Sequence, residues 1–153
     1  MHHRTWFAVR LALVVGSLAA AHAKETRIGF AVGATVRAVA NMELRSVPST
    51  VDLSAGDLRR GFVDVSQPTS LVIRSNSASG YSLDLMTVTP MLSSMIVYGL
   101  DSELSLGAQG GSIVQRWQSP HVVNLNLKFR FSLAPGLKAG TYPWPVAVAV
   151  RPL

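Results

Sequence analysis

The sequence predicts an all-β fold, an antiparallel β-sandwich, and three observations carry this prediction. Apolar and polar residues alternate in short runs, as in strands that bury one face. Glycine, proline, asparagine and serine interrupt these runs about every ten residues, which is typical of sandwiches. Beyond the N-terminal apolar run, no stretch keeps a helical period. A closed barrel is the alternative arrangement of the same strands.

The first residues have the order of parts of a secretory signal peptide. Arg4 and Arg10 precede an apolar run, Leu11–Ala21, which leads into the cleavage pattern Ala21-His22-Ala23. We therefore expect export through the Sec pathway, with residues 1–23 removed before Lys24. A membrane anchor is the alternative, although a spanning helix needs roughly 20 apolar residues and this run is about half as long. The expected location is the periplasm or the cell surface, with no membrane span after cleavage.

The mature chain, residues 24–153, is expected to be a single domain. Removing Arg4 and Arg10 from the 14 basic residues leaves 12 against 8 acidic residues, a net charge of about +4. Its basic residues are scattered, so a nucleic-acid partner is not expected. The chain has no cysteine, which excludes both disulfides and a lipid-modified cysteine. About 130 residues can bury enough apolar surface to fold without a covalent staple.

The strands are expected in a definite order along the chain. The first alternation covers Ile28–Ala40, and the region after it is broken at Pro48 and Gly56. Shorter runs bounded by turn residues then predict strands over Gly61–Val65, Ser70–Arg74, Tyr81–Met86, Met95–Tyr98, Ser102–Leu106 and Ser112–Trp117.

The two C-terminal strands differ in character. Val122–Leu133 is the longest alternation, with Leu127, Phe129 and Phe131 among the residues of one face, and it predicts a half-buried antiparallel strand. Thr141–Val150 contains two prolines, which cannot donate ladder hydrogen bonds. We therefore expect its first part at a sheet edge or at the start of a strand.

No group of residues predicts catalysis, a metal site or a cofactor. His121 is the only histidine of the mature chain, and no serine lies in a G-x-S-x-G turn, so a catalytic triad is not expected. Zinc would need three or four histidine, cysteine or carboxylate ligands, and calcium would need clustered oxygens. The acidic residues are spread singly. We expect that the protein is not an enzyme.

Three aromatic residues leave two interpretations open. Trp117, Tyr142 and Trp144 are candidates for a sugar-binding or other surface platform, because indole and phenol rings are amphipathic. The same residues are equally suited to packing the core of a sandwich, which we favour. Trp144, between two prolines, is the one expected to be more exposed.

Several short motifs in order resemble the spore coat protein U family, whose members are subunits of archaic chaperone–usher pili. The mature chain opens as F-x-V-x-A-x-V-x-A over Phe30–Ala38. A glycine–tyrosine pair at Gly80 begins a later strand, and Gly140-Thr141-Tyr142 precedes the last one. Members of that family usually carry cysteines, which this chain lacks. The resemblance implies an Ig-like, pilin-like sandwich.

The resemblance also implies a function, assembly into a pilus or surface fibre by donor-strand addition. An N-terminal segment with small and apolar residues at every second position fills a groove in the next subunit, and the candidates here are Ile28, Phe30, Val32, Ala34 and Val36. The implied partners are copies of the chain or related subunits, with a periplasmic chaperone and an outer-membrane usher. Two alternatives stay open: an ordinary first strand within its own domain, and a self-contained secreted module that binds a glycan or an envelope protein.

Overall fold

The structure is a computed structural model, and it describes residues 33–116 and 122–153. Thr35–Leu153 forms one compact unit. The predicted signal peptide, His121 and Trp117 lie outside the described residues, as do Ile28, Phe30 and Val32.

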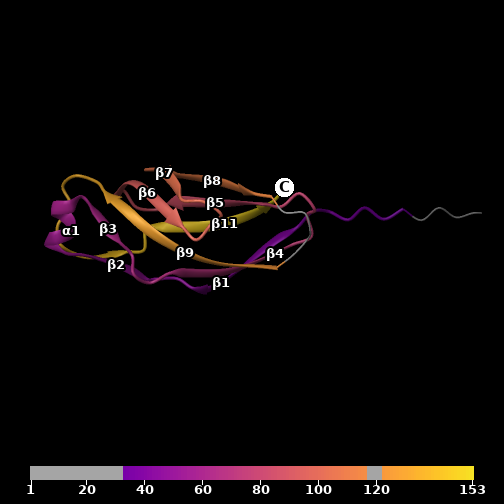
Figure 1. Ribbon diagram of the computed structural model, residues 1–153, viewed down its shortest axis with the longest axis horizontal. Helices are drawn as coiled ribbons and strands as arrows, with labels where there is room; N and C mark the ends of the chain where they lie inside the picture. The colour runs from indigo at the N-terminus through magenta and orange to yellow at the C-terminus, as the bar shows by residue number, and fades with distance from the viewer. Residues whose placement is uncertain (1–32, 117–121) are drawn as a thin grey trace, which may run out of the picture. The chain divides into compact units, whose positions relative to one another are not determined.

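The described chain is built almost entirely of antiparallel strands, with one short helix (Figure 1). The elements are β1 (Ala40–Ser46), β2 (Thr50–Leu53), α1 (Ala55–Arg60), β3 (Phe62–Asp64), β4 (Thr69–Ser75), β5 (Tyr81–Thr87), β6 (Leu92–Tyr98), β7 (Leu104–Gly107), β8 (Gly110–Gln115), β9 (Val122–Leu133), β10 (Gly140–Pro143) and β11 (Val146–Pro152).

Most strands belong to one long sheet that folds over on itself to form a sandwich. The strands follow the order β1-β4-β9-β6-β7-β8-β5-β11, and β3 pairs with β9 off this path. A second, two-stranded sheet joins β10 to β2. Figure 1 shows β1 and β4 in one layer, facing a layer that contains β5, β8 and β11. The all-β sandwich predicted from the alternating runs is therefore confirmed.

Strand β9 connects the two layers. Its first half pairs with β4, where Leu127 lies opposite Thr69, and its second half pairs with β6, where Phe129 lies opposite Val97. β4 pairs only with the first half of β9, and β3 pairs with the second half. Twelve residues of alternating pattern are long enough to serve both layers.

The core lies between the two layers. Buried residues of β9 and β5, such as Phe131 and Leu83, are fully enclosed together with Met95 of β6. The alternation of each strand accounts for this arrangement, because every second side chain points to the same face. Trp144 packs edge-on against Phe129 and Phe131, with ring centroids 5.5 Å apart in each pair.

The predicted strands from residue 61 onward correspond to β3–β9, and Val122–Leu133 is reproduced residue for residue. The expected strand over Thr141–Val150 is divided into β10 and β11, because the chain breaks the ladder at Trp144-Pro145. Pro143 lies in the two-stranded sheet, away from the interior of the large one.

One expectation for the N-terminal part is wrong within the described residues. Gly33–Val39 is not a strand, and pairing begins only at Ala40. The breaks expected at Pro48 and Gly56 are confirmed, because Pro48 lies between β1 and β2, and Gly56 lies in α1, after β2 has ended. The helix itself was not predicted. Helix α1 is stabilised by a capping box, in which the Ser54 and Asp57 side chains each bind the other's backbone N–H, and it ends at Gly61 with φ 77°.

Candidate functional site

The two end strands of the large sheet, β1 and β11, lie side by side without pairing to each other. In the described sheet, β1 pairs only with β4, and β11 pairs only with β5. The two strands are nevertheless in contact. Each therefore has one edge whose backbone N–H and C=O groups take no part in a ladder, and such edges can accept a further strand. We call the space along these two edges the seam.

Apolar side chains line the inner side of the seam. Met42 and Leu44 of β1 lie opposite Ile73 and Leu71, which are buried. Residues directly opposite each other in a ladder point to the same face, so Met42 and Leu44 also point inward. Leu44 is nevertheless 50% exposed. The core is therefore incompletely covered along β1.

The β11 side of the seam has the same character. Val148 and Val150 lie opposite Leu85 and Leu83, both fully buried, and so they point into the core. Both valines are only partly buried. The inner side of the seam thus has partly exposed apolar residues on both strands.

The turn between β4 and β5, residues 76–80, binds both edge strands at one end of the sandwich. The Ser77 hydroxyl donates to the carbonyl of Leu153 (2.7 Å), and the N–H of Leu153 donates to the carbonyl of Gly80 (3.2 Å). These bonds fix the residues that follow β11. Asn76 binds the residues that precede β1, so this turn bridges the seam where a direct ladder is absent.

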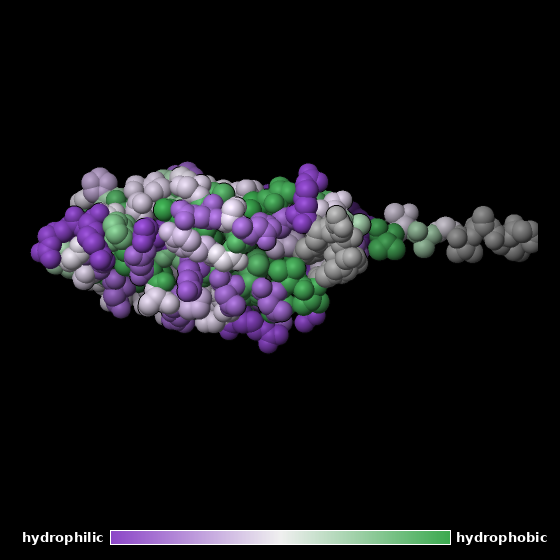
Figure 2. Space-filling view, viewed as in Figure 1, coloured by the Kyte–Doolittle hydropathy of each residue, from purple (hydrophilic) through white to green (hydrophobic). Residues whose placement is uncertain are grey.

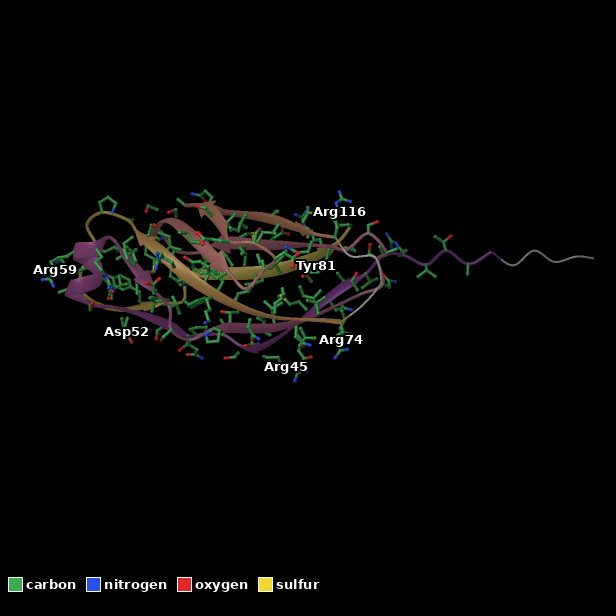
Figure 3. The ribbon with its side chains drawn as sticks, in the orientation of Figure 1. Arg45, Asp52, Arg59, Arg74, Tyr81 and Arg116 are labelled. Carbon is green, nitrogen blue, oxygen red and sulfur yellow. The ribbon has the colours of Figure 1, made fainter. Side chains whose placement is uncertain are left out.

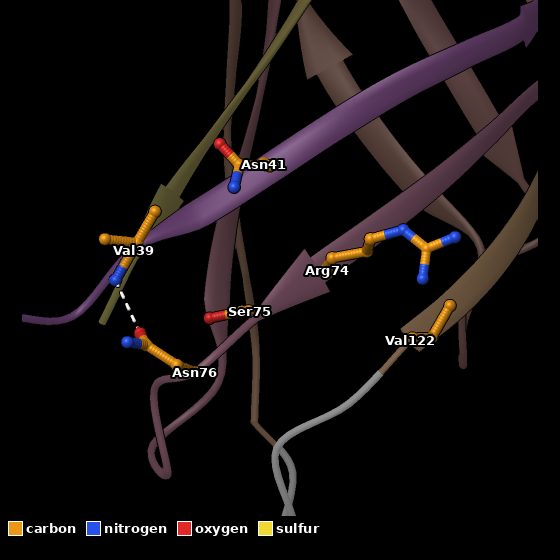
Figure 4. Close-up of a pocket in the computed structure, with 6 residues that line it drawn as sticks. All are labelled: Val39, Asn41, Arg74, Ser75, Asn76 and Val122. Carbon is orange, nitrogen blue, oxygen red and sulfur yellow. Dashed lines mark hydrogen bonds between the residues drawn. The ribbon is translucent and has the colours of Figure 1, made fainter.

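The Asn76 side chain binds the backbone on two sides of Ala38, and Figure 4 shows the bond to Val39. Its Oδ1 accepts from the N–H of Val39 (2.6 Å), and its Nδ2 donates to the carbonyl of Arg37 (2.9 Å). The backbone N–H of Asn76 also donates to the carbonyl of Val39 (3.1 Å). We call these three bonds the Asn76 clamp. It sits in a surface pocket of about 370 Å³ that Arg74 also lines.

Only two of the donor-strand candidates can be placed. Ala34 and Val36 are described, and both are exposed, with 81% of Val36 accessible to solvent. Neither belongs to a strand. The expectation of an ordinary first strand over Ile28–Ala40 is therefore wrong for Gly33–Val39, while Ile28, Phe30 and Val32 lie outside the described residues.

Tyr142 and Trp144 have structural roles. The Tyr142 hydroxyl donates to the carbonyl of Lys138 (2.9 Å) and accepts from its N–H (3.2 Å), a tyrosine corner that fixes the loop after β9. Trp144 packs against the core phenylalanines, and its Nε1 is buried without a hydrogen-bond partner. Tyr142 and Trp144 are both partly buried and pack against the core, so core packing describes them better than a ligand platform. That Trp144 is the most exposed of the three aromatics stays a prediction, because Trp117 lies outside the described residues.

Charged side chains are paired locally rather than gathered into a site. Asp84 accepts two bonds from Arg151, and these bonds and one from Ser112 hold the pKa of Asp84 below its usual 3.8. Similarly, bonds from the Ser54 side chain and backbone lower the pKa of Asp57. Figure 3 shows the labelled charged residues at well-separated places on the surface.

A second ionic cluster covers Phe62. The guanidinium groups of Arg60 and Arg130 lie 5.1 and 4.7 Å from its ring centre, within the range of a cation–π contact. Arg130 also forms a two-bond ion pair with Asp64. Both arginines are thus engaged within the fold.

The face seen in Figure 2 is largely polar, with separate apolar areas. Among the described residues, the exposed large apolar side chains lie partly in strands and partly in the segments between or beside them, and they are Val36, Val39, Leu44, Met86, Val88, Val114, Val122 and Leu153. Across residues 33–116 and 122–153, no helix has the length and apolar character needed to cross a bilayer.

The comparisons with known proteins give no match: no family model, no curated protein and no solved structure matches the chain. The resemblance to the spore coat protein U family stays a prediction.

Proposed function

We propose that this chain is an exported structural subunit of a pilus or surface fibre, in which the N-terminal segment of one copy adds as a strand to the seam of the next. The observation that carries the proposal is the seam itself. β1 and β11 lie side by side, and the edges along the seam are not joined in a ladder. The apolar residues that face inward on these two strands are partly exposed.

A strand added at the seam would satisfy two needs of the sheet at once. Because β1 and β11 are in contact, the two strands would have to separate to admit it. Its backbone would then hydrogen-bond to their free edges, and its alternate side chains would cover Leu44, Val148 and Val150. An N-terminal segment with apolar residues at Ile28, Phe30, Val32, Ala34 and Val36 has the required period of two. Ala34 and Val36 are exposed and unpaired in a ladder, as a segment available to a partner must be.

The self-contained binding module is the less supported function. It requires an exposed platform, and Tyr142 and Trp144 are engaged in the loop and the core. Should the chain fold without assembling, this second function would regain support.

The test uses two substitutions at equally exposed positions on opposite faces of one layer. Leu44 and Val122 are each 50% exposed, but Leu44 faces inward at the seam, whereas Val122 lies opposite the exposed Arg74 on the outer face. The mature chain, residues 24–153, would be secreted into a bacterial periplasm, and its molar mass would be measured by light scattering on a sizing column.

We expect ordered, heat-dissociable multimers from the wild-type chain and from Val122→Ser. Leu44→Ser should reduce multimers to monomers, because a serine at the seam removes apolar contact with the added strand. A wild-type chain that is monomeric and melts cooperatively would overturn the proposal, since the sandwich would then be complete by itself. Equal loss of multimers in both variants would also count against a specific role of the seam.

A further inference from the structure

We infer that Asn76 is a positioning residue that makes the link between successive subunits rigid; this inference rests on the proposed function. In the fibre, the donor segment of a subunit lies in its neighbour, and β1 lies in its own sandwich. Arg37, Ala38 and Val39 are the residues between Val36, the last donor candidate, and Ala40, the first residue of β1. The stiffness of the fibre at each joint depends on what holds these three residues.

The clamp holds them because an asparagine side chain resembles a peptide group. Its amide offers one acceptor and two donor hydrogens on a short stem. Here Oδ1 takes the N–H of Val39 and Nδ2 binds the carbonyl of Arg37. These are the backbone groups that a neighbouring strand would bind if the ladder continued. The β1–β4 ladder ends with Ala40 opposite Ser75, and Asn76 extends it by its backbone N–H, which donates to the Val39 carbonyl, and by its side chain.

The turn that carries Asn76 is itself held in place. The Ser77 N–H donates to the Ser75 hydroxyl (3.1 Å), and the Ser77 hydroxyl binds the carbonyl of Leu153. Gly80 ends the turn with φ 114°, and a Cβ at this position would meet the Gln115 carbonyl oxygen at 2.0 Å. The turn that carries Asn76 is therefore held by contacts with β4, β8 and the residue that follows β11.

Two variants distinguish the contributions of the two hydrogen bonds that the Asn76 side chain forms. Asn76→Ala removes both bonds and leaves only the backbone bond to the Val39 carbonyl. Asn76→Asp keeps an acceptor for the Val39 N–H but cannot donate to the Arg37 carbonyl. Asn124→Ala is the matched control, because Asn124 is an exposed asparagine in β9 opposite Val72.

The first measurement is amide hydrogen exchange at Val39 in the mature chain, which does not require a fibre. Exchange should be faster by roughly tenfold in Asn76→Ala, because one exposed hydrogen bond contributes about that factor. In Asn76→Asp, the exchange rate of the Val39 amide should stay close to the wild-type rate. In Asn124→Ala, it should equal the wild-type rate. Equal exchange in wild type and Asn76→Ala would overturn the clamp.

The second measurement is the persistence length of assembled fibres in electron micrographs. Fibres of Asn76→Ala should be severalfold more flexible than wild-type fibres, with Asn76→Asp between them and Asn124→Ala unchanged. A purely structural role of Asn76 would lower the melting temperature without altering the fibre joint. Fibres of equal stiffness would overturn the inference and leave the proposed function standing. A wild-type chain that forms no fibres would overturn the proposed function, and the stiffness role with it.

Discussion

At the scale of single residues, the pair Asp84–Arg151 ties the last strand to β5. Arg151 donates to both carboxylate oxygens at 2.7 and 2.9 Å, and the pKa of Asp84 is lowered from 3.8 by hydrogen bonds from Arg151 and Ser112. A carboxylate whose pKa is lower in the folded state stabilises the fold above the unfolded value of 3.8. This contribution disappears as the pH falls below 3.8, through the folded pKa.

We therefore expect Asp84→Asn to lower the melting temperature at neutral pH and to narrow the gap between neutral and acid melting temperatures. Thermal melts of the two proteins at neutral pH and below pH 3.8 check this expectation. Asp101→Asn serves as the control, because Asp101 is an exposed carboxylate in the turn before β7. If Asp84→Asn and Asp101→Asn have the same pH dependence, the ion pair contributes nothing specific.

The Asn76 clamp illustrates what the sequence cannot predict at this scale. The sequence shows a polar turn directly after a strand here, and the structure has this turn at residues 76–80, after β4. The partners of Asn76 are Arg37 and Val39, about forty positions earlier, and nothing in a local pattern indicates them. Contacts at such separation depend on the register between β1 and β4, which alternation alone leaves open.

At the scale of elements, the loop between β9 and β10 depends on the tyrosine corner. Tyr142→Phe removes both bonds to the Lys138 backbone and keeps the ring. We expect a loss of about 1 kcal/mol in the free energy of unfolding, the usual net value of such hydrogen bonds. Chemical denaturation measures it, with Tyr98→Phe in β6 as the control. An unchanged stability would show that the loop is held by other contacts.

The alternation that predicts strands identifies β3–β9 well but places the first strand too early. Even-numbered residues are apolar from Ile28 through Leu44, so the pattern continues without a break across the point where pairing begins. The β1–β4 ladder begins with Ala40 opposite Ser75, and before Ala40 a single backbone bond remains, from the Asn76 N–H to the Val39 carbonyl. A pattern records which side chains could be buried, and only the partner strand decides which of them are. Helix α1 was readable from Ser54-x-x-Asp57 and Gly61, although its six residues are too few to show a period.

At the scale of the whole molecule, the seam predicts that a free peptide stabilises the sandwich. A peptide covering Arg27–Ala40 should raise the melting temperature of the chain that begins at Arg37, because a ligand that binds only the folded state adds about 2.7 kcal/mol at a hundred times its dissociation constant. A peptide with Phe30 and Val32 replaced by serine is the control. If neither peptide changes the melting temperature, the seam does not accept a strand.

Strand β9 also determines when the molecule can fold. Its partners β3 and β4 are made some sixty residues earlier, with Val63 opposite Phe131 and Thr69 opposite Leu127. Because the chain is synthesised from its N-terminus, β3, β4 and β6 are made before β9, and their apolar faces stay uncovered until β9 is available. Pairing over such distances along the chain makes folding slow, in the range of milliseconds to seconds. Until Leu133 has been added, the nascent chain has open sheet edges that can pair with other molecules, and the risk of aggregation is therefore greatest before β9 is complete.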